Sequence, residues 1–190
     1  MSDWLLVLAG VLLTAGTALF VAGEFSLVAL DRPMVEAAAA QGDSGAGSVL
    51  ISLRRLSTQL SGSQVGITIT TLALGFLASP ALTSLLTTPL AGVGLTGTAL
   101  TTAAGLLALI LVTLFSMIFG ELVPQFLGMS APLATAKVVA LPLRLFTSAA
   151  KPFILVLNGS ANQVLRRLGI EPQEELSAAR SPAELASMVR

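Results

Sequence analysis

The sequence predicts an all-α membrane protein with three transmembrane helices and a proline-broken belt of interfacial helices. Hydrophobic residues occupy 54% of the 190 positions and charged residues only 11%, whereas about a quarter of the residues in a soluble domain are charged. Two long stretches, residues 4–23 and 56–120, contain no charged residue. Pro132, Pro142 and Pro152 then interrupt a further apolar stretch.

The first transmembrane helix is expected at about residues 4–30. About 20 apolar residues at 1.5 Å per residue span a ~30 Å hydrocarbon core, and Asp31-Arg32-Pro33 would end the helix at the interface. The apolar run is too long for a cleavable signal peptide, and no basic segment precedes it. Residues 33–55 are expected to form an interfacial helix that leads to the second span.

The uncharged stretch 56–120 is too long for one span and long enough for two. Its middle holds a cluster of residues that commonly interrupt helices. These are Pro80, Pro89, Gly92, Gly94 and Gly97. The second and third transmembrane helices are therefore expected at about 61–79 and 98–120.

The distribution of basic residues predicts the orientation. The connector 31–58 carries Arg32, Arg54 and Arg55, whereas the connector 80–97 carries no Lys or Arg. Because short cytoplasmic loops are enriched in Lys and Arg, we expect the first connector in the cytoplasm, with the N-terminus outside and the C-terminus inside. The chain is then a multi-pass protein of the cell (inner) membrane.

Residues 131–165 are apolar but carry basic residues seven positions apart, at Lys137, Arg144 and Lys151. Seven residues are close to two helical turns, so these side chains would share one face. Short amphipathic pieces with one basic stripe fit helices that lie in the membrane interface. The alternative is a fourth span at about 141–158.

The transport domain is expected to cover residues 1–165, and residues 166–190 to form a cytoplasmic linker. Ser181-Pro182-Ala183-Glu184 has Ser at the N-cap and Pro at the first helical position, which is a helix-start signature. We therefore expect the linker to lead into a further soluble region.

The composition also excludes several classes of chemistry. The chain has no His and no Cys, which removes disulfides, thiolate or imidazole metal ligands and His-based catalytic triads. Its net charge of zero gives no basic footprint for nucleic acid. We expect neither an enzyme nor a nucleic-acid-binding protein.

Two carboxylates, Glu24 and Glu121, lie within or at the edge of the expected spans. An ionisable residue at membrane depth is a functional candidate by default. Pro124 cannot donate a hydrogen bond and crowds the carbonyl of Gly120, and a carbonyl beside a carboxylate suits a hard cation such as Mg²⁺. The alternative is a proline that ends a helix at the interface, with Glu121 reaching to the headgroups.

Small and hydroxyl residues recur along the three expected spans. Most of them are explained by close helix packing, as in the spacing of Gly62 and Gly66. Ser26 and Ser63 differ, because both are expected at the depth of Glu121. Three helices could therefore bring two hydroxyls, a carboxylate and a carbonyl into one oxygen-only site.

The motifs 20–27 (FVAGEFSL), 60–68 (LSGSQVGIT) and 119–125 (FGELVPQ) resemble the transmembrane domain of the CorC / cyclin-M (CNNM) magnesium transporter family. The resemblance covers about residues 4–170. It implies a homodimer in the lipid bilayer that exports Mg²⁺, with Na⁺ entry as the coupled step. It also implies cytoplasmic CBS domains that bind ATP and are absent from this chain.

The resemblance assigns Ser26, Ser63, Gly120 and Glu121 as Mg²⁺ ligands. Glu24 is then expected in the Na⁺ path or as a helix contact. Further positions could line the ion pathway or support it: Gln64, Gly66, Ser116 and Pro124. Two residues depart from the family pattern, since Gln125 replaces a common Lys and Ser63 replaces Asn or Thr, which leaves selectivity among divalent cations open.

Two rival functions are compatible with the same residues. The helices could anchor regulatory domains as a scaffold or sensor without transport, or they could form a channel-like pore.

Overall fold

A computed structural model describes residues 2–169 of the chain, and these residues form helices without any strand. The elements in chain order are α1 (Asp3–Ala29), α2 (Arg32–Ala40), α3 (Ser44–Leu53), α4 (Leu56–Gly92), α5 (Gly97–Phe115), the π-helix η1 (Ser116–Leu122), α6 (Val123–Ser130), α7 (Pro132–Ala149) and α8 (Lys151–Arg167). The expected linker 166–190 begins inside α8, which continues to Arg167, and residues 170–190, with the helix-start signature, lie outside the described residues.

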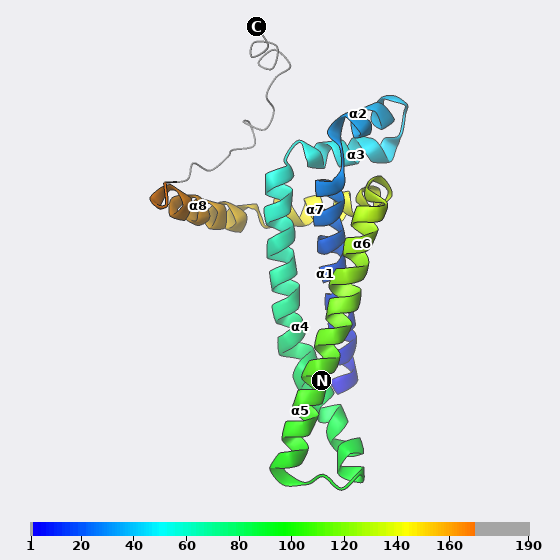
Figure 1. The fold of residues 1–190 in the computed structure, drawn as a ribbon, viewed down its shortest axis with the longest axis vertical. Coiled ribbons are helices and arrows are strands. Elements are labelled where there is room, and N and C mark those ends of the chain that lie inside the picture. The colour runs from blue at the N-terminus through cyan, green and yellow to red at the C-terminus, as the bar shows by residue number, and fades with distance from the viewer. Residues whose placement is uncertain (1, 170–190) are drawn as a thin grey trace.

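Three long apolar helices run side by side and confirm the predicted three spans (Figure 1). They are α1, α4 and the continuous rod Gly97–Ser130 formed by α5, η1 and α6. Their lengths of 27, 37 and 34 residues correspond to about 40, 55 and 50 Å at 1.5 Å per residue. All three exceed a ~30 Å hydrocarbon core, and the end of the bundle where α4 meets α5 reaches past the N-terminus of α1 (Figure 1).

The second span is longer than the sequence predicts because Pro80 and Pro89 lie inside α4 and do not end it. A proline removes one backbone hydrogen bond, and spanning helices tolerate this loss where hydroxyls and neighbouring helices compensate. Next to Pro80, Ala78 packs against Gly10 of α1, so a neighbouring helix supports α4 at this point. The chain turns instead after Gly92, where Gly94 and Gly97 adopt positive φ angles of 91° and 59°, which glycine accepts without strain.

Glycines set the close packing of α1 against α4. A Cβ atom at Gly10 would lie 2.8 Å from the Cβ of Ala78, and one at Gly66 would lie 2.6 Å from the Phe20 ring. Between these two contacts, the hydroxyls of Thr17 and Thr70 form a hydrogen bond of 2.8 Å. The two helices are therefore antiparallel, with small residues where their backbones approach.

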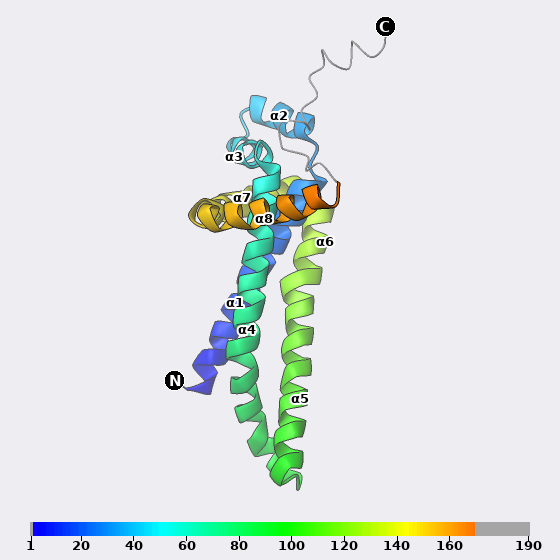
Figure 2. The same ribbon diagram turned by 90° about the vertical axis from the view of Figure 1, so that its left-hand side faces the viewer.

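The third span has a different neighbour in each half. Its upper part, η1 and α6, packs against α1, whereas α5 makes its main contacts with α4. A Cβ at Gly128 of α6 would lie 2.9 Å from the backbone nitrogen of Ser26. Figure 2 shows α1 diverging from α5 toward the N-terminus.

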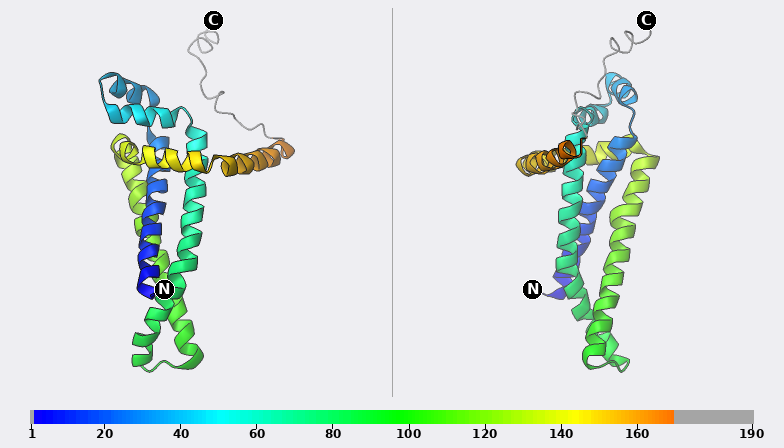
Figure 3. Two further views of the ribbon diagram at one scale, coloured as in Figure 1. Left: turned by 180° about the vertical axis from the view of Figure 1, so that it is seen from behind. Right: turned by 60° about the vertical axis from the view of Figure 1, so that its left-hand side comes forward.

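The short helices gather at one end of the bundle (Figures 1 and 3). α7 and α8 lie across the long helices in both Figure 1 and Figure 2, and they meet at a bend of 78°. This arrangement matches the predicted belt and does not form a straight fourth span at 141–158. The α2–α3 hairpin packs on α7 through a small core that contains Val35, Val49 and Ala140.

Two polar contacts tie α3 to α7. Lys137 pairs with Asp43, whose side chain also caps α3 by accepting from the Ala46 amide at 3.2 Å. The Lys137 hydrogen bond, followed by the Ala46 amide, holds the pKa of Asp43 below its usual value. Arg144 donates to the Ser48 carbonyl at 3.2 Å.

Candidate cation site

The third span changes helix type next to Glu121. Residues 116–122 form the π-helix η1, in which the Val123 amide donates to the Ile118 carbonyl five residues back. Pro124 follows directly and has no amide hydrogen with which to continue a regular ladder. The predicted backbone irregularity is therefore present. The alternative of a proline that ends the helix is wrong, because the rod continues as α6 to Ser130.

The π-helix places Ser116 and Glu121 on the wall of one cavity of about 340 Å³. The cavity lies between α4, α5 and η1, and Thr71, Ser79 and Thr113 also line it. The Ser116 hydroxyl is buried and has no hydrogen-bond partner among the described residues. The Glu121 side chain is exposed in the single chain. A carboxylate and several hydroxyls thus share one partly open space.

Gly120 lies on the other side of η1, against α1. A Cβ at Gly120 would meet the Ser116 hydroxyl and the Thr14 methyl at 3.4 Å and the Thr17 Cβ at 3.6 Å. Because Thr17 bonds to Thr70 of α4, a polar layer crosses all three spans at the depth of Glu121. We call this the Glu121 layer; it consists of Thr17, Thr70, Ser116, Gly120 and Glu121.

Ser26 and Ser63 lie outside the Glu121 layer, closer to the α2–α3 end. Ser26 is nine residues from Thr17 on α1, and Ser63 is seven residues from Thr70 on α4. These separations correspond to about 13 Å and 10 Å along the helix axes. The structure therefore does not gather the four predicted ligands around one point. It separates Gly120 and Glu121 from the two serines by about two helical turns.

Both serines are fully buried. The Ser26 hydroxyl donates to the Gly23 carbonyl at 3.3 Å, and the Ser63 hydroxyl has no partner among the described residues. Next to Ser63, the side chain of Gln64 lies near the Glu24 carboxylate. Glu24 thus lies beside α4 at the depth of Ser63. Ser26, Ser63, Glu24 and Gln64 form a second polar layer, the serine layer.

Two other predicted positions serve packing. Gly66 admits the Phe20 ring, and Pro124 is buried where α6 begins. The partnership of Ser116 with Glu121 was not predicted as part of the ligand set, because residues five apart share a face only in a π-helix. The Thr17–Thr70 bond was also missed, since Ser and Thr hydroxyls in a helix can instead bond to the carbonyl three or four residues back, as both threonines also do here.

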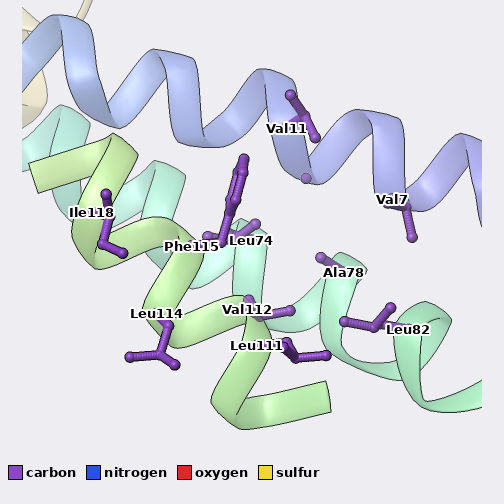
Figure 4. A pocket seen from close by; sticks show the side chains of 11 residues that line it. Val7, Val11, Leu74, Ala78, Leu82, Leu111, Val112, Leu114, Phe115 and Ile118 are labelled. Atoms are coloured by element: carbon purple, nitrogen blue, oxygen red, sulfur yellow. The ribbon is translucent and has the colours of Figure 1, made fainter. Parts of the chain in front are cut away.

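A second cavity, of about 430 Å³, is lined by apolar residues and is unsuited to a cation (Figure 4). It lies between α1, α4 and α5, and its walls include Val11, Leu74 and Phe115. All of its lining residues are apolar, so it offers no side-chain ligand to a hard cation. Within residues 2–169 no three acidic side chains gather either, so a cation here would depend on neutral oxygens with a single carboxylate.

Comparison with known proteins agrees with the motifs. Residues 8–190 match the family model for the cyclin M transmembrane N-terminal domain. A UPF0053 protein of Mycobacterium tuberculosis is 49% identical over 184 residues, which cover 97% of this chain and 40% of the relative. The UPF0053 protein YhdT of Bacillus subtilis is 34% identical over 184 residues, with coverages of 97% and 40%. An uncharacterized protein of M. tuberculosis H37Rv is 34% identical over 183 residues, with coverages of 96% and 52%. The chain thus spans about half or less of these relatives.

Proposed function

The chain belongs to the CNNM family of cyclin M transmembrane domains, and from this premise we propose that it is a Mg²⁺ transport domain that exports Mg²⁺ in exchange for Na⁺. It is a multi-pass membrane domain. The transported ion, the coupling ion and the homodimeric state are the proposed part.

The observation that carries the proposal is the Glu121 layer, which crosses the three spans. A carboxylate within a span costs at least about 2.5 kcal/mol at the helix centre and usually marks an ion path. Here it lies on a π-helix and lines one cavity with Ser116, whose buried hydroxyl has no hydrogen-bond partner among the described residues. Mg²⁺ requires oxygen ligands and gives up its water reluctantly, so a carboxylate that shares a cavity with an unpartnered hydroxyl is a suitable arrangement.

The serine layer supplies a second group of oxygens on the same path. We propose that Mg²⁺ first meets Ser26 and Ser63, near the basic and expected cytoplasmic end, and then passes to Gly120 and Glu121. In this scheme the two layers are successive stations, and Glu121 provides the charge that offsets dehydration. The exposure of Glu121 in the single chain fits a homodimer in which a second copy covers this face.

The test uses the purified chain in liposomes that contain a Mg²⁺-sensitive dye, with an imposed Na⁺ gradient. We expect Glu121→Gln to abolish Na⁺-driven Mg²⁺ flux. The matched control is Glu36→Gln, since Glu36 is exposed outside the spans and pairs only with Arg32 at 3.0 Å. Wild-type flux in Glu121→Gln would refute the site. Mg²⁺ flux that ignores the Na⁺ gradient would favour a pore, and no flux in the wild type, with its cytoplasmic domains restored, would favour a scaffold.

A further inference from the structure

A basic cavity lies at the belt, apart from both polar layers. It has a volume of about 260 Å³ and sits where α4 begins, α7 ends and α8 begins. Three cationic side chains line it, those of Arg55, Arg144 and Lys151, and no acidic residue does. Three segments that are distant in sequence thus bring three positive charges to one space.

These charges are not neutralised within the described residues. The salt bridges of residues 2–169 are Arg32–Glu36 and Lys137–Asp43, and neither involves a cation of the cavity. Three cations that converge without a counter-charge repel one another. An anion in the cavity would remove this repulsion.

The cavity also offers oriented hydrogen-bond donors. Arg144 uses one nitrogen to donate to the Ser48 carbonyl at 3.2 Å, which fixes the guanidinium while its other N–H groups stay available. Ser148 and Thr147 also line the cavity; Thr147 is 2% exposed, its hydroxyl packs against Gly62 of α4, and that hydroxyl has no hydrogen-bond partner among the described residues. The first residues of α4 and α8 lie at its edge, and helix N-termini favour negative charge.

The geometry points to a binding site for a phosphate group, with an anionic phospholipid as its source. Arginine guanidinium and hydroxyl donors around an uncompensated positive charge are what phosphate oxygens require. The charge-free stretch of α4 starts at Leu56, directly after Arg55, so the cavity lies at the level of lipid headgroups.

An apolar groove next to the cavity favours a lipid over a free anion. The groove, of about 560 Å³, is formed by α4 and α8. Most of its wall is apolar, with Val65, Leu72, Phe153 and Leu157, and Ser61, Gln64, Thr68 and Asn158 are its polar residues. Ser61, Val65 and Leu72 continue the face of α4 on which Thr58 lines the basic cavity, because residues three and four apart share a face. A phosphate in the cavity would therefore leave its acyl chains beside an apolar wall. This inference is independent of ion transport.

The experiment measures lipid retention by the purified chain in detergent, using native mass spectrometry with dioleoylphosphatidylglycerol and, for comparison, the zwitterionic phosphatidylcholine. The test variant is Arg55→Gln/Arg144→Gln/Lys151→Gln. The matched control, Arg54→Gln/Arg166→Gln/Arg167→Gln, removes the same charge outside the cavity. A basic residue beside anionic lipid contributes on the order of fivefold in affinity, so the test variant should bind phosphatidylglycerol roughly a hundredfold more weakly, and the control should bind close to wild type.

A second arm separates the two sources of phosphate. Sodium phosphate is titrated against sodium chloride of equal ionic strength while the thermal midpoint is recorded. Stabilisation by phosphate that the test variant loses, without a change in lipid retention, would keep the phosphate site and assign it to a free anion. Equal behaviour of wild type and test variant in both arms would overturn the site.

Lys151→Gln alone keeps the inference testable if the triple variant does not fold. Lys151 lines the cavity and is exposed, so folding should be unaffected, while phosphatidylglycerol affinity should fall on the order of fivefold. Unchanged affinity in this variant would also overturn the site.

Discussion

Gly66 is the position where the packing of α1 on α4 can be tested most directly. A Cβ atom there would lie 2.6 Å from three atoms of the Phe20 ring, well inside van der Waals contact. The ring cannot easily yield, because Phe20 is 8% exposed and its centroid lies 4.7 Å from that of Phe146. Gly66→Ala must therefore push α4 away from α1 or displace two packed rings.

The expected magnitude follows from two opposing terms. Overpacking a tight contact costs about 1–3 kcal/mol, whereas replacing Gly by Ala inside a helix gains up to about 1 kcal/mol. Gly75 is a matched control on the same helix, since a Cβ there meets nothing within 4 Å. The propensity gain cancels in the comparison, so Gly66→Ala should be less stable than Gly75→Ala by about 1–3 kcal/mol.

The assay is reversible unfolding in mixed micelles, followed by circular dichroism, on both variants under identical conditions. Equal free energies of unfolding would refute the close approach of α1 and α4 at this position. If Gly66→Ala alone lowers the free energy of unfolding and also reduces Mg²⁺ flux, then the packing of α1 on α4 at this contact also matters for transport.

Three other predictions follow from polar contacts. Ser63→Ala should leave the free energy of unfolding unchanged or slightly higher, because its buried hydroxyl has no partner, and calorimetry should show weaker Mg²⁺ binding; equal Mg²⁺ affinity would remove Ser63 from the path. A double-mutant cycle of Thr17→Val and Thr70→Val should give a coupling of about 0.6 kcal/mol and at most about 1.7 kcal/mol, and a coupling of zero would contradict the hydrogen bond. Because the folded pKa of Asp43 is lowered, its contribution to stability is complete above the unfolded value of 3.8 and is lost as pH falls through the folded pKa. The thermal midpoint should therefore drop more steeply on acidification from pH ~5 to ~3 in the wild type than in Asp43→Asn, and parallel slopes would contradict the Lys137 pair.

Hydropathy was sufficient to predict the three spans and the belt, because the bilayer imposes helices on any long uncharged segment. The same reasoning ended the second span too early, at residue 79 instead of Gly92. Pro80 and Pro89 read as breaks by the rules for soluble helices, yet both lie inside α4. The turn depends on the positive φ angles of Gly94 and Gly97, and a sequence does not distinguish these glycines from others that merely pack.

For the candidate site, the sequence predicted which residue types are present better than it predicted how they lie relative to one another. Glu121 is recognisable as a carboxylate in an apolar span. The irregular backbone around Gly120 is predicted by Pro124. The separation of Ser26 from Glu121 is not predicted in this way, because it depends on the axial register between parallel helices. Here that register is set by the contact of Gly128 with Ser26, a pair whose proximity no local pattern reveals.

The change of neighbours along the third span has a mechanical consequence. Its α6 half is clamped against α1, its α5 half rests mainly on α4, and the junction between them is η1. Sharp bends in long helices often occur at π-helical segments, so a rotation of α5 relative to α6 would be centred on η1. Such a rotation would change the size of the apolar cavity shown in Figure 4 and would reorient Glu121 at the junction. Movement at one face of the membrane could in this way open or shut access for an ion held by that carboxylate.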